Sequence, residues 1–266
     1  TAVTSYTKYD GSRDQKLKYT WNGATGCTYG DLSGLSAAAY GALPVADQSK
    51  YELIGTMYYK VSLFDTSVVY DYASGKYLSK SYTVEGIADG LVTADLLESQ
   101  TVYDGKKTQK LLYTWNYASG ALVSDKADLS KVDTSVIYDY EVGNTKYLDT
   151  SYTLTGGKTS LVEGAEIESY TSYSDTKDQK LLYTWNYEGG TKLGVSGALP
   201  SDGSITDSVV YGYAGRYLSW SVSVDNKMTD DLLLTTTAVT SYTKYDGSRD
   251  QKLKYTWNGA TGCTYG

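Results

Sequence analysis

Residues 1–30 read TAVTSYTKYDGSRDQKLKYTWNGATGCTYG, and the same thirty residues recur without a change as residues 237–266. Thirty identities in thirty positions do not arise by chance, and self-similarity at a fixed period is the signature of a repeat architecture. The simplest interpretation is a long protein built of 236-residue tandem units, with residues 237–266 as the start of the next unit. The alternative is a chain whose matching ends close a ring, or one whose end is simply duplicated.

A second, more diverged repeat lies inside the unit. The first of its two strings is QKLKYTWN or QKLLYTWN, at 15–22, 109–116, 179–186 and 251–258. The second string contains SVVY or SVIY and begins at residues 65, 133 and 206. The two strings alternate along the chain, which defines modules. We predict module 1 at 1–97 with an insertion at about 27–64, module 2 at 98–167, module 3 at 168–236, and the start of the next unit at 237–266.

The first string has the alternation of a half-buried β-strand. In the first copy, Leu17, Tyr19 and Trp21 alternate with Lys16, Lys18, Thr20 and Asn22. An Asp-Gly pair at 10–11 precedes the string and repeats at 104–105, which indicates a hairpin turn. We therefore predict a hairpin in each module with a repeated core stripe, formed by Leu17, Tyr19, Trp21, Leu111, Tyr113, Trp115, Leu181, Tyr183 and Trp185.

The second string also has the pattern of a hairpin. A β-branched run meets a turn at Gly75, Gly143 or Gly215, and the chain returns through a second strand. One face of that second strand is apolar, and the other begins with a tyrosine at Tyr77, Tyr147 and Tyr217. These three tyrosines are candidate surface contacts, which would stack on sugar rings or on a neighbouring fibre. The alternative is that they only cover the sheet.

These patterns predict an all-β fold, as an elongated tandem array of antiparallel β-hairpin modules. A solenoid-like arrangement and stacked small sheets both fit the repeat. The insertion at about 27–64 is the one piece that the modules do not share. Its AAAY stretch at 37–40 allows one helical turn, whereas Gly34, Gly41 and Pro44 favour a structured loop or an added strand.

The second string resembles the tyrosine–aspartate repeats of bacterial surface and toxin-shell proteins. The residues that carry the resemblance are Tyr70-Asp71-Tyr72, Gly75, Lys76 and Leu78. Tyr77 interrupts the family's pattern, and Gly212 replaces the aspartate in the third copy. The resemblance implies a β-hairpin spiral outside the cytoplasm and brings no active site with it. Aromatic glycan- and choline-binding cell-wall modules share the composition but not the strings.

The two cysteines, Cys27 and Cys263, occupy the same place in successive units, so each unit has one cysteine and no partner for it. They are candidates for an interchain disulfide between neighbouring strands of a fibre. The alternative is a small buried thiol.

Carboxylates suggest a cation site at one place. The sequence DGSRD at 10–14 is similar to the start of a calcium loop, in which oxygen ligands alternate along a tight turn. Its counterparts at 104–108 and 174–178 gain lysines, which oppose cation binding. An ordinary turn, in which the aspartate binds its own backbone, is the simpler interpretation. We therefore expect no cofactor, with calcium held by other aspartate pairs as the alternative.

Composition excludes several classes of function. The chain has 266 residues, 30 of them Tyr, no His and a net charge of −7. The negative charge argues against nucleic acid as a partner, and no apolar run is long enough to span a membrane. Nucleophile elbows, phosphate loops and metal-binding cysteine pairs are missing from the sequence. Because most polar positions come in triplicate, whereas a catalytic site is singular, we expect no enzyme.

The sequence thus favours a structural protein, an extracellular filament or cell-surface fibre of bacterial or archaeal type. Its partner would be itself, along or between fibres. The alternative is a repeat adhesin or glycan-binding array, in which weak aromatic sites on glycans or other cells gain affinity through multivalency.

Overall fold

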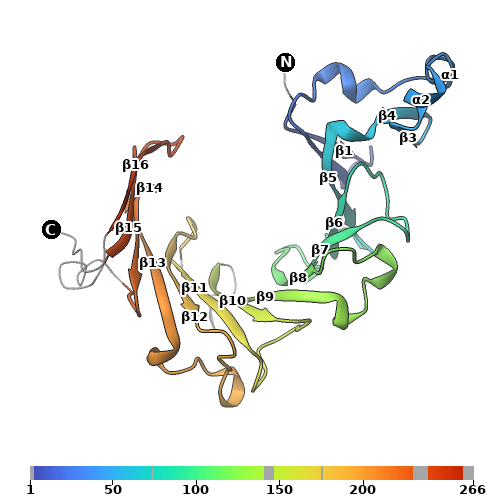
Figure 1. The fold of residues 1–266 in the computed structure, drawn as a ribbon. Coiled ribbons are helices and arrows are strands. Elements are labelled where there is room, and N and C mark those ends of the chain that lie inside the picture. The colour runs from blue at the N-terminus through green and yellow to red at the C-terminus, as the bar shows by residue number, and fades with distance from the viewer. Residues whose placement is uncertain (1–2, 74, 141–146, 175, 230–238, 260–266) are drawn as a thin grey trace. The chain divides into compact units, whose positions relative to one another are not determined.

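A computed structural model describes residues 3–73, 75–140, 147–174, 176–229 and 239–259, and it confirms the all-β prediction. Fourteen strands form one sheet in which each strand pairs with its neighbours along the chain, in the order β1-β2-β5-β6-β7-β8-β9-β10-β11-β12-β13-β14-β15-β16. The strand pairs with a described register are antiparallel. A two-stranded sheet, β3-β4, is separate. Figure 1 shows the strands following one another in chain order.

The first eight strands are β1 Ser5–Tyr9, β2 Leu17–Gly23, β3 Tyr51–Ile54, β4 Met57–Lys60, β5 Phe64–Asp71, β6 Lys80–Glu85, β7 Leu97–Tyr103 and β8 Leu111–Tyr117. The other eight are β9 Val132–Tyr140, β10 Leu148–Thr155, β11 Ile167–Tyr173, β12 Leu181–Tyr187, β13 Ile205–Ala214, β14 Tyr217–Asp225, β15 Val239–Tyr245 and β16 Leu253–Asn258. The described residues hold two short α-helices, α1 Ala37–Gly41 and α2 Val45–Gln48.

The chain divides into two compact units, Thr1–Asp133 and Thr134–Gly266. Among its described residues, the first unit has one apolar cluster around Trp21 and Phe64 and another around Trp115 and Val84. In the second unit, a cluster on β13, β14 and β15 contains Val222 and buries its aliphatic face against Tyr242 and Met228. The module boundaries stay a prediction, because they follow the repeat strings rather than these contacts.

Hairpins of the same type keep the same register in every repeat. On the first hairpin, a pair of threonines lies across the two strands and their hydroxyls are 2.9–3.1 Å apart, at Thr7–Thr20, Thr101–Thr114, Thr171–Thr184 and Thr243–Thr256. A shift of one residue would move every apolar side chain to the opposite face, so the covered face fixes the register.

The insertion contains both elements that its sequence allowed. Helix α1 begins after Ser36, whose side chain accepts a hydrogen bond from the backbone of Ala39, and strands β3 and β4 add a small hairpin. The ring of Tyr59 from β4 packs edge-on against Trp21 at 4.9 Å. The insertion therefore contributes to the core around Trp21.

Among the residues that the structure describes, no helix has the length and hydropathy needed to cross a membrane.

Candidate functional site

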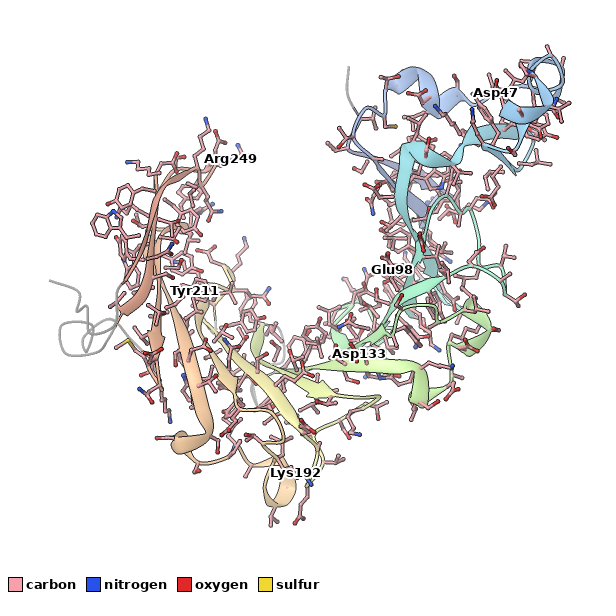
Figure 2. The ribbon with its side chains drawn as sticks, viewed as in Figure 1. Asp47, Glu98, Asp133, Lys192, Tyr211 and Arg249 are labelled. Atoms are coloured by element: carbon pink, nitrogen blue, oxygen red, sulfur yellow. The ribbon has the colours of Figure 1, made fainter. Side chains whose placement is uncertain are left out.

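The candidate site is the repeated hairpin itself, which occurs as β1-β2 and as β15-β16. Both copies pair in one register: Tyr6 lies opposite Trp21, and Tyr242 lies opposite Trp257. Each has a turn with a glycine at positive φ, Gly11 or Gly247, where a side chain would be strained. Figure 2 labels Arg249 in the turn of the second copy.

The second strand of the hairpin is covered in one copy and open in the other. Strand β2 pairs with β5, and Trp21 is 1% exposed. Within the described part of the chain, β16 ends the sheet, and Trp257 is 60% exposed. Leu253 and Tyr255, on the same strand, are also exposed. The same residues therefore have opposite environments because, among the described strands, only the first copy has a strand paired on this side.

The first strand of the hairpin shows the reverse. Strand β15 pairs with β14, where Val222 lies opposite Tyr242, and Tyr242 is buried. Strand β1 begins the sheet in the described chain, and Tyr9 on it is 50% exposed. Each copy thus lacks the neighbour that the other copy has.

A buried serine shapes the surface that covers the hairpin. Ser67 on β5 lies opposite Trp21, donates to the carbonyl of Gly86 at 2.7 Å and accepts from the backbone nitrogen of Ala88 at 2.8 Å. The carbonyl of Ala88 in turn accepts a hydrogen bond from Trp21 Nε1 at 2.7 Å. The serine and the tryptophan therefore fix the same loop. We call this arrangement the serine bridge.

The serine bridge recurs in full at Ser208, and its two serine bonds recur at Ser135. Ser208 bonds the carbonyl of Asn226 and the backbone nitrogen of Met228, and Trp185 Nε1 donates to the Met228 carbonyl at 2.8 Å. Ser135 makes the same pair of bonds, to Gly156 and Lys158. The sequence reasoning missed these serines. The signal was present, because every copy of the second string has Ser before its β-branched pair.

Lysine side chains bridge neighbouring hairpins at the turn end. Lys180 Nζ donates to the carbonyl of Gly215 and lies 5.2 Å from the ring centre of Tyr213. Lys16 makes the matching contacts with Gly75 and Tyr72 in the first unit. Adjacent hairpins are therefore joined by side chains as well as by the backbone ladder.

The predicted core stripe is buried most deeply at its tryptophans. Trp21, Trp115 and Trp185 are all buried. Tyr19 is also buried, whereas Tyr113 and Tyr183 are half-buried. The leucines Leu17, Leu111 and Leu181 are half-buried, because each begins its strand beside an exposed turn. Tyr and Trp of one strand stack at about 5 Å, as in Tyr183–Trp185 at 4.9 Å.

The predicted surface tyrosines are half-buried. Tyr77, Tyr147 and Tyr217 have the same intermediate exposure. Their role in binding sugars or a fibre stays a prediction.

Cys27 lies in the core around Trp21. It is 1% exposed, and burial raises the pKa of its thiol. A crosslink through Cys27 would require the residues around it to open. Cys263 lies outside the described residues.

The carboxylate of Asp10, in the first turn, is hydrogen-bonded to its own loop. Asp10 accepts hydrogen bonds from the backbone and the hydroxyl of Ser12, and these bonds hold the pKa of its carboxyl below the usual range. Asp104 and Asp246 bind their turns in the same way. Among the described residues, no three acidic or cysteine side chains are grouped to hold a metal ion. The described residues therefore offer no candidate calcium site.

The insertion holds a small cavity of about 100 Å³. Its lining includes Asp31, Tyr51, Tyr58 and Lys60. Tyr40 stacks on Tyr58 with their ring centres 3.7 Å apart. The cavity is too small for a sugar ring and its substituents, since ligand pockets span about 300–1,000 Å³.

No protein-family model matches the chain, and no curated protein matches it. Among solved structures, the crystal structure of TcdB2-TccC3-Cdc42 aligns with 94% of this chain at 11% identity and a TM-score of 0.24. The alignment covers 12% of that chain. A likeness this weak carries no argument about function, and the resemblance to tyrosine–aspartate repeats stays a prediction.

Proposed function

We propose that this chain is a structural segment of an extracellular filament, built from tandem 236-residue units of antiparallel β-hairpins. The proposal rests on one observation. Each copy of the repeated hairpin has a neighbouring strand on a different edge, β5 beside the first copy and β14 beside the second. The first copy shows what covers its second strand, and the second copy shows what covers its first strand. Together they define a hairpin that lies between β14 and β5 and has both edges paired.

Such a hairpin would continue the sheet from one unit to the next. Each strand pairing that it needs is already present in one of the two copies. The junction between β14 and β15 has the register of the other junctions of its kind: Val222 faces Tyr242 as Tyr152 faces Tyr170. The junction between β2 and β5 matches that between β12 and β13, since a Trp faces a Ser in both. A repeat protein whose stability comes from nearest-neighbour contacts grows in this way.

The mechanism of such a protein is mechanical. Backbone hydrogen bonds join successive strands, and the covalent chain passes through every one of them. The lysine contacts at one end of the strands, and the tryptophan bonds to the serine-bridge loops at the other, hold neighbouring hairpins together. The proposal assigns no reaction to the chain.

The test compares chains in which residues 31–266 follow Gly266 zero, one or three further times. Electron micrographs should show rods of uniform width, whose length increases by a constant step with each added unit. Beads separated by variable gaps, or compact globules, would overturn the proposal. On cells that express the protein, immunogold labelling should follow continuous fibres. Binding on a glycan panel without fibres would instead favour the repeat adhesin.

A further inference from the structure

The charged residues of the first unit gather at the two ends of its strands. Each strand of the main sheet runs antiparallel to the next, so the tight turns lie at one edge and the long loops at the other. These six ranges contain every charged residue of residues 1–133. We call residues 8–18, 71–80 and 104–110 the turn edge, and residues 24–65, 85–98 and 118–133 the loop edge.

The two edges have opposite net charges. The ranges of the turn edge carry +2, +1 and +2, and those of the loop edge carry −2, −4 and −1. Strand β7, with seven residues, separates the edges by about 24 Å. Salt at about 0.15 M screens charges over about 8 Å. The positive charge of the turn edge is therefore not cancelled by the loop edge behind it.

Exposed charges on both edges lack partners of opposite sign. Lys106 and Lys107 are exposed, and no acidic side chain of the described residues forms an ion pair with them. Glu85 and Glu98 lie on paired strands of the loop edge and have no basic partner within the described part of the chain. Burial and the negative charge of Glu85 raise the pKa of the Glu98 carboxyl. The carboxylates of this edge thus repel one another, which favours a cationic partner.

We propose that the turn edge of one copy of this chain is a docking site for the loop edge of a second copy, so that two fibres lie side by side. The two edges are opposite in sign and similar in magnitude, which is the complementarity that such a contact needs. Turns and loops stay outside the backbone ladder, so this surface is separate from the strand junctions that build the filament. The inference rests on the proposed function and deepens it, because it names the partner that a filament takes at its sides.

The second unit has the same polarity in weaker form. Asp139 and Asp149, near the turn end of β9 and β10, depart from it. Elsewhere its loops are negative and its turns are positive, with −2 at 156–168, −2 at 188–207, +1 at 213–219 and +2 at 244–254. Copies that lie side by side therefore bring opposite charges together in both units. Each exposed ion pair contributes little, so the contact gains its strength from their number.

The test is charge reversal on one edge of the 266-residue chain, followed by sedimentation velocity. The wild-type chain should show masses that rise with concentration above 29.0 kDa at about 0.15 M NaCl and return to 29.0 kDa at about 1 M NaCl. Lys106→Glu/Lys107→Glu on the turn edge should weaken association about tenfold or more, and so should Glu85→Lys/Glu98→Lys on the loop edge. A mixture of the two variants should associate again, because each supplies the native edge that the other lacks.

Matched controls separate the edges from total charge and from unfolding. Lys126→Glu/Lys131→Glu changes the net charge by the same amount as the turn-edge variant, but it makes the loop edge more negative. Association of this variant should therefore strengthen. All of these side chains are exposed, so every variant should keep the urea midpoint of the wild type. Equal weakening by the two lysine variants would show that total charge alone decides association, and it would overturn the inference.

Other outcomes overturn it as well. These are a wild-type chain that stays at 29.0 kDa at both salt concentrations, and a mixture of variants that does not associate. A monomeric chain that binds heparin through Lys106 and Lys107 would assign the turn edge to an anionic polymer instead.

Tandem chains separate this inference from the proposed function. Rods that never lie side by side would retain the filament and remove the lateral contact. Salt-dependent pairing of 266-residue chains, without rods from tandem chains, would do the reverse. Salt-dependent shortening of single rods would place the contact within one chain and would overturn docking of a second copy.

Discussion

The side-chain oxygen Oε1 of Gln179 lies 3.0 Å from the backbone nitrogen of Leu148 and accepts its hydrogen bond. Gln179 sits in the turn before β12, at a φ of 42°, which is strained for a residue with a side chain. Gln15, Gln109 and Gln251 share this conformation, and Gln251 makes the same bond to Leu218 at 3.1 Å. The amide thus offsets backbone strain by capping the start of a neighbouring strand.

Replacement of Gln179 should separate these two effects. Gln179→Ala keeps the strain and removes the bond, so we expect the free energy of unfolding to fall by about 1–2 kcal/mol. Gln179→Gly also removes the bond but relieves the strain, so it should be more stable than the Ala variant by about 1 kcal/mol. Urea denaturation measures both. Equal stability of the two variants would contradict the strain argument. Gln251→Ala is the matched control beside the open strand and should cost less.

Loss of the buried Ser208 hydroxyl should lower the stability of the fold markedly, although the substitution removes a single atom. Ser208 is fully buried and satisfies the Asn226 carbonyl and the Met228 nitrogen. Ser208→Ala leaves both groups without their partner, so we expect a loss of about 1–3 kcal/mol in the free energy of unfolding. Ser119→Ala, at an exposed serine, should stay within about 0.5 kcal/mol of the wild type. A Ser208→Ala chain as stable as the control would show that water replaces the hydroxyl.

Alkaline pH should weaken the fold through its buried tyrosines. Burial raises the pKa of Tyr19 and of Tyr82 from 10.0 to about 12. The folded state therefore keeps protons that the unfolded chain has already lost. The stability from these groups is complete below pH 10 and is lost as the pH rises from 10 through about 12. Urea midpoints at several pH values, together with tyrosinate absorbance, measure the loss. Tyr82→Phe should reduce the slope, and a flat midpoint across this window would contradict the prediction.

The thiol of Cys27 should be protected in the native protein. Its burial and its raised pKa both slow reaction with thiol reagents. In a Cys263→Ser chain, we expect labelling at least about ten times slower than in urea, since reaction waits for local opening. Trp21→Ala should speed the labelling, because the two side chains share one core. Native labelling as fast as in urea would make Cys27 available for the interchain disulfide.

Much of the fold could be predicted from local patterns. Alternation of Lys and Thr with Leu, Tyr and Trp gives the strand at Leu17–Gly23, and Asp10-Gly11 gives its turn, because both depend on nearby residues alone. The same reasoning found the tryptophans of the core. It did not find the serine bridges, because their bonds reach a loop about twenty residues away, nor the packing of Tyr59 from the insertion on Trp21.

The sequence by itself determined the offset between the two identical stretches, the hairpins and the face that carries the aromatic residues. Only the tertiary structure decided that Trp21 is buried and Trp257 exposed, although thirty identical residues surround each position. The physical reason is that a hairpin's internal register depends on its own residues, whereas the burial of its outer edges depends on the strands paired beside it.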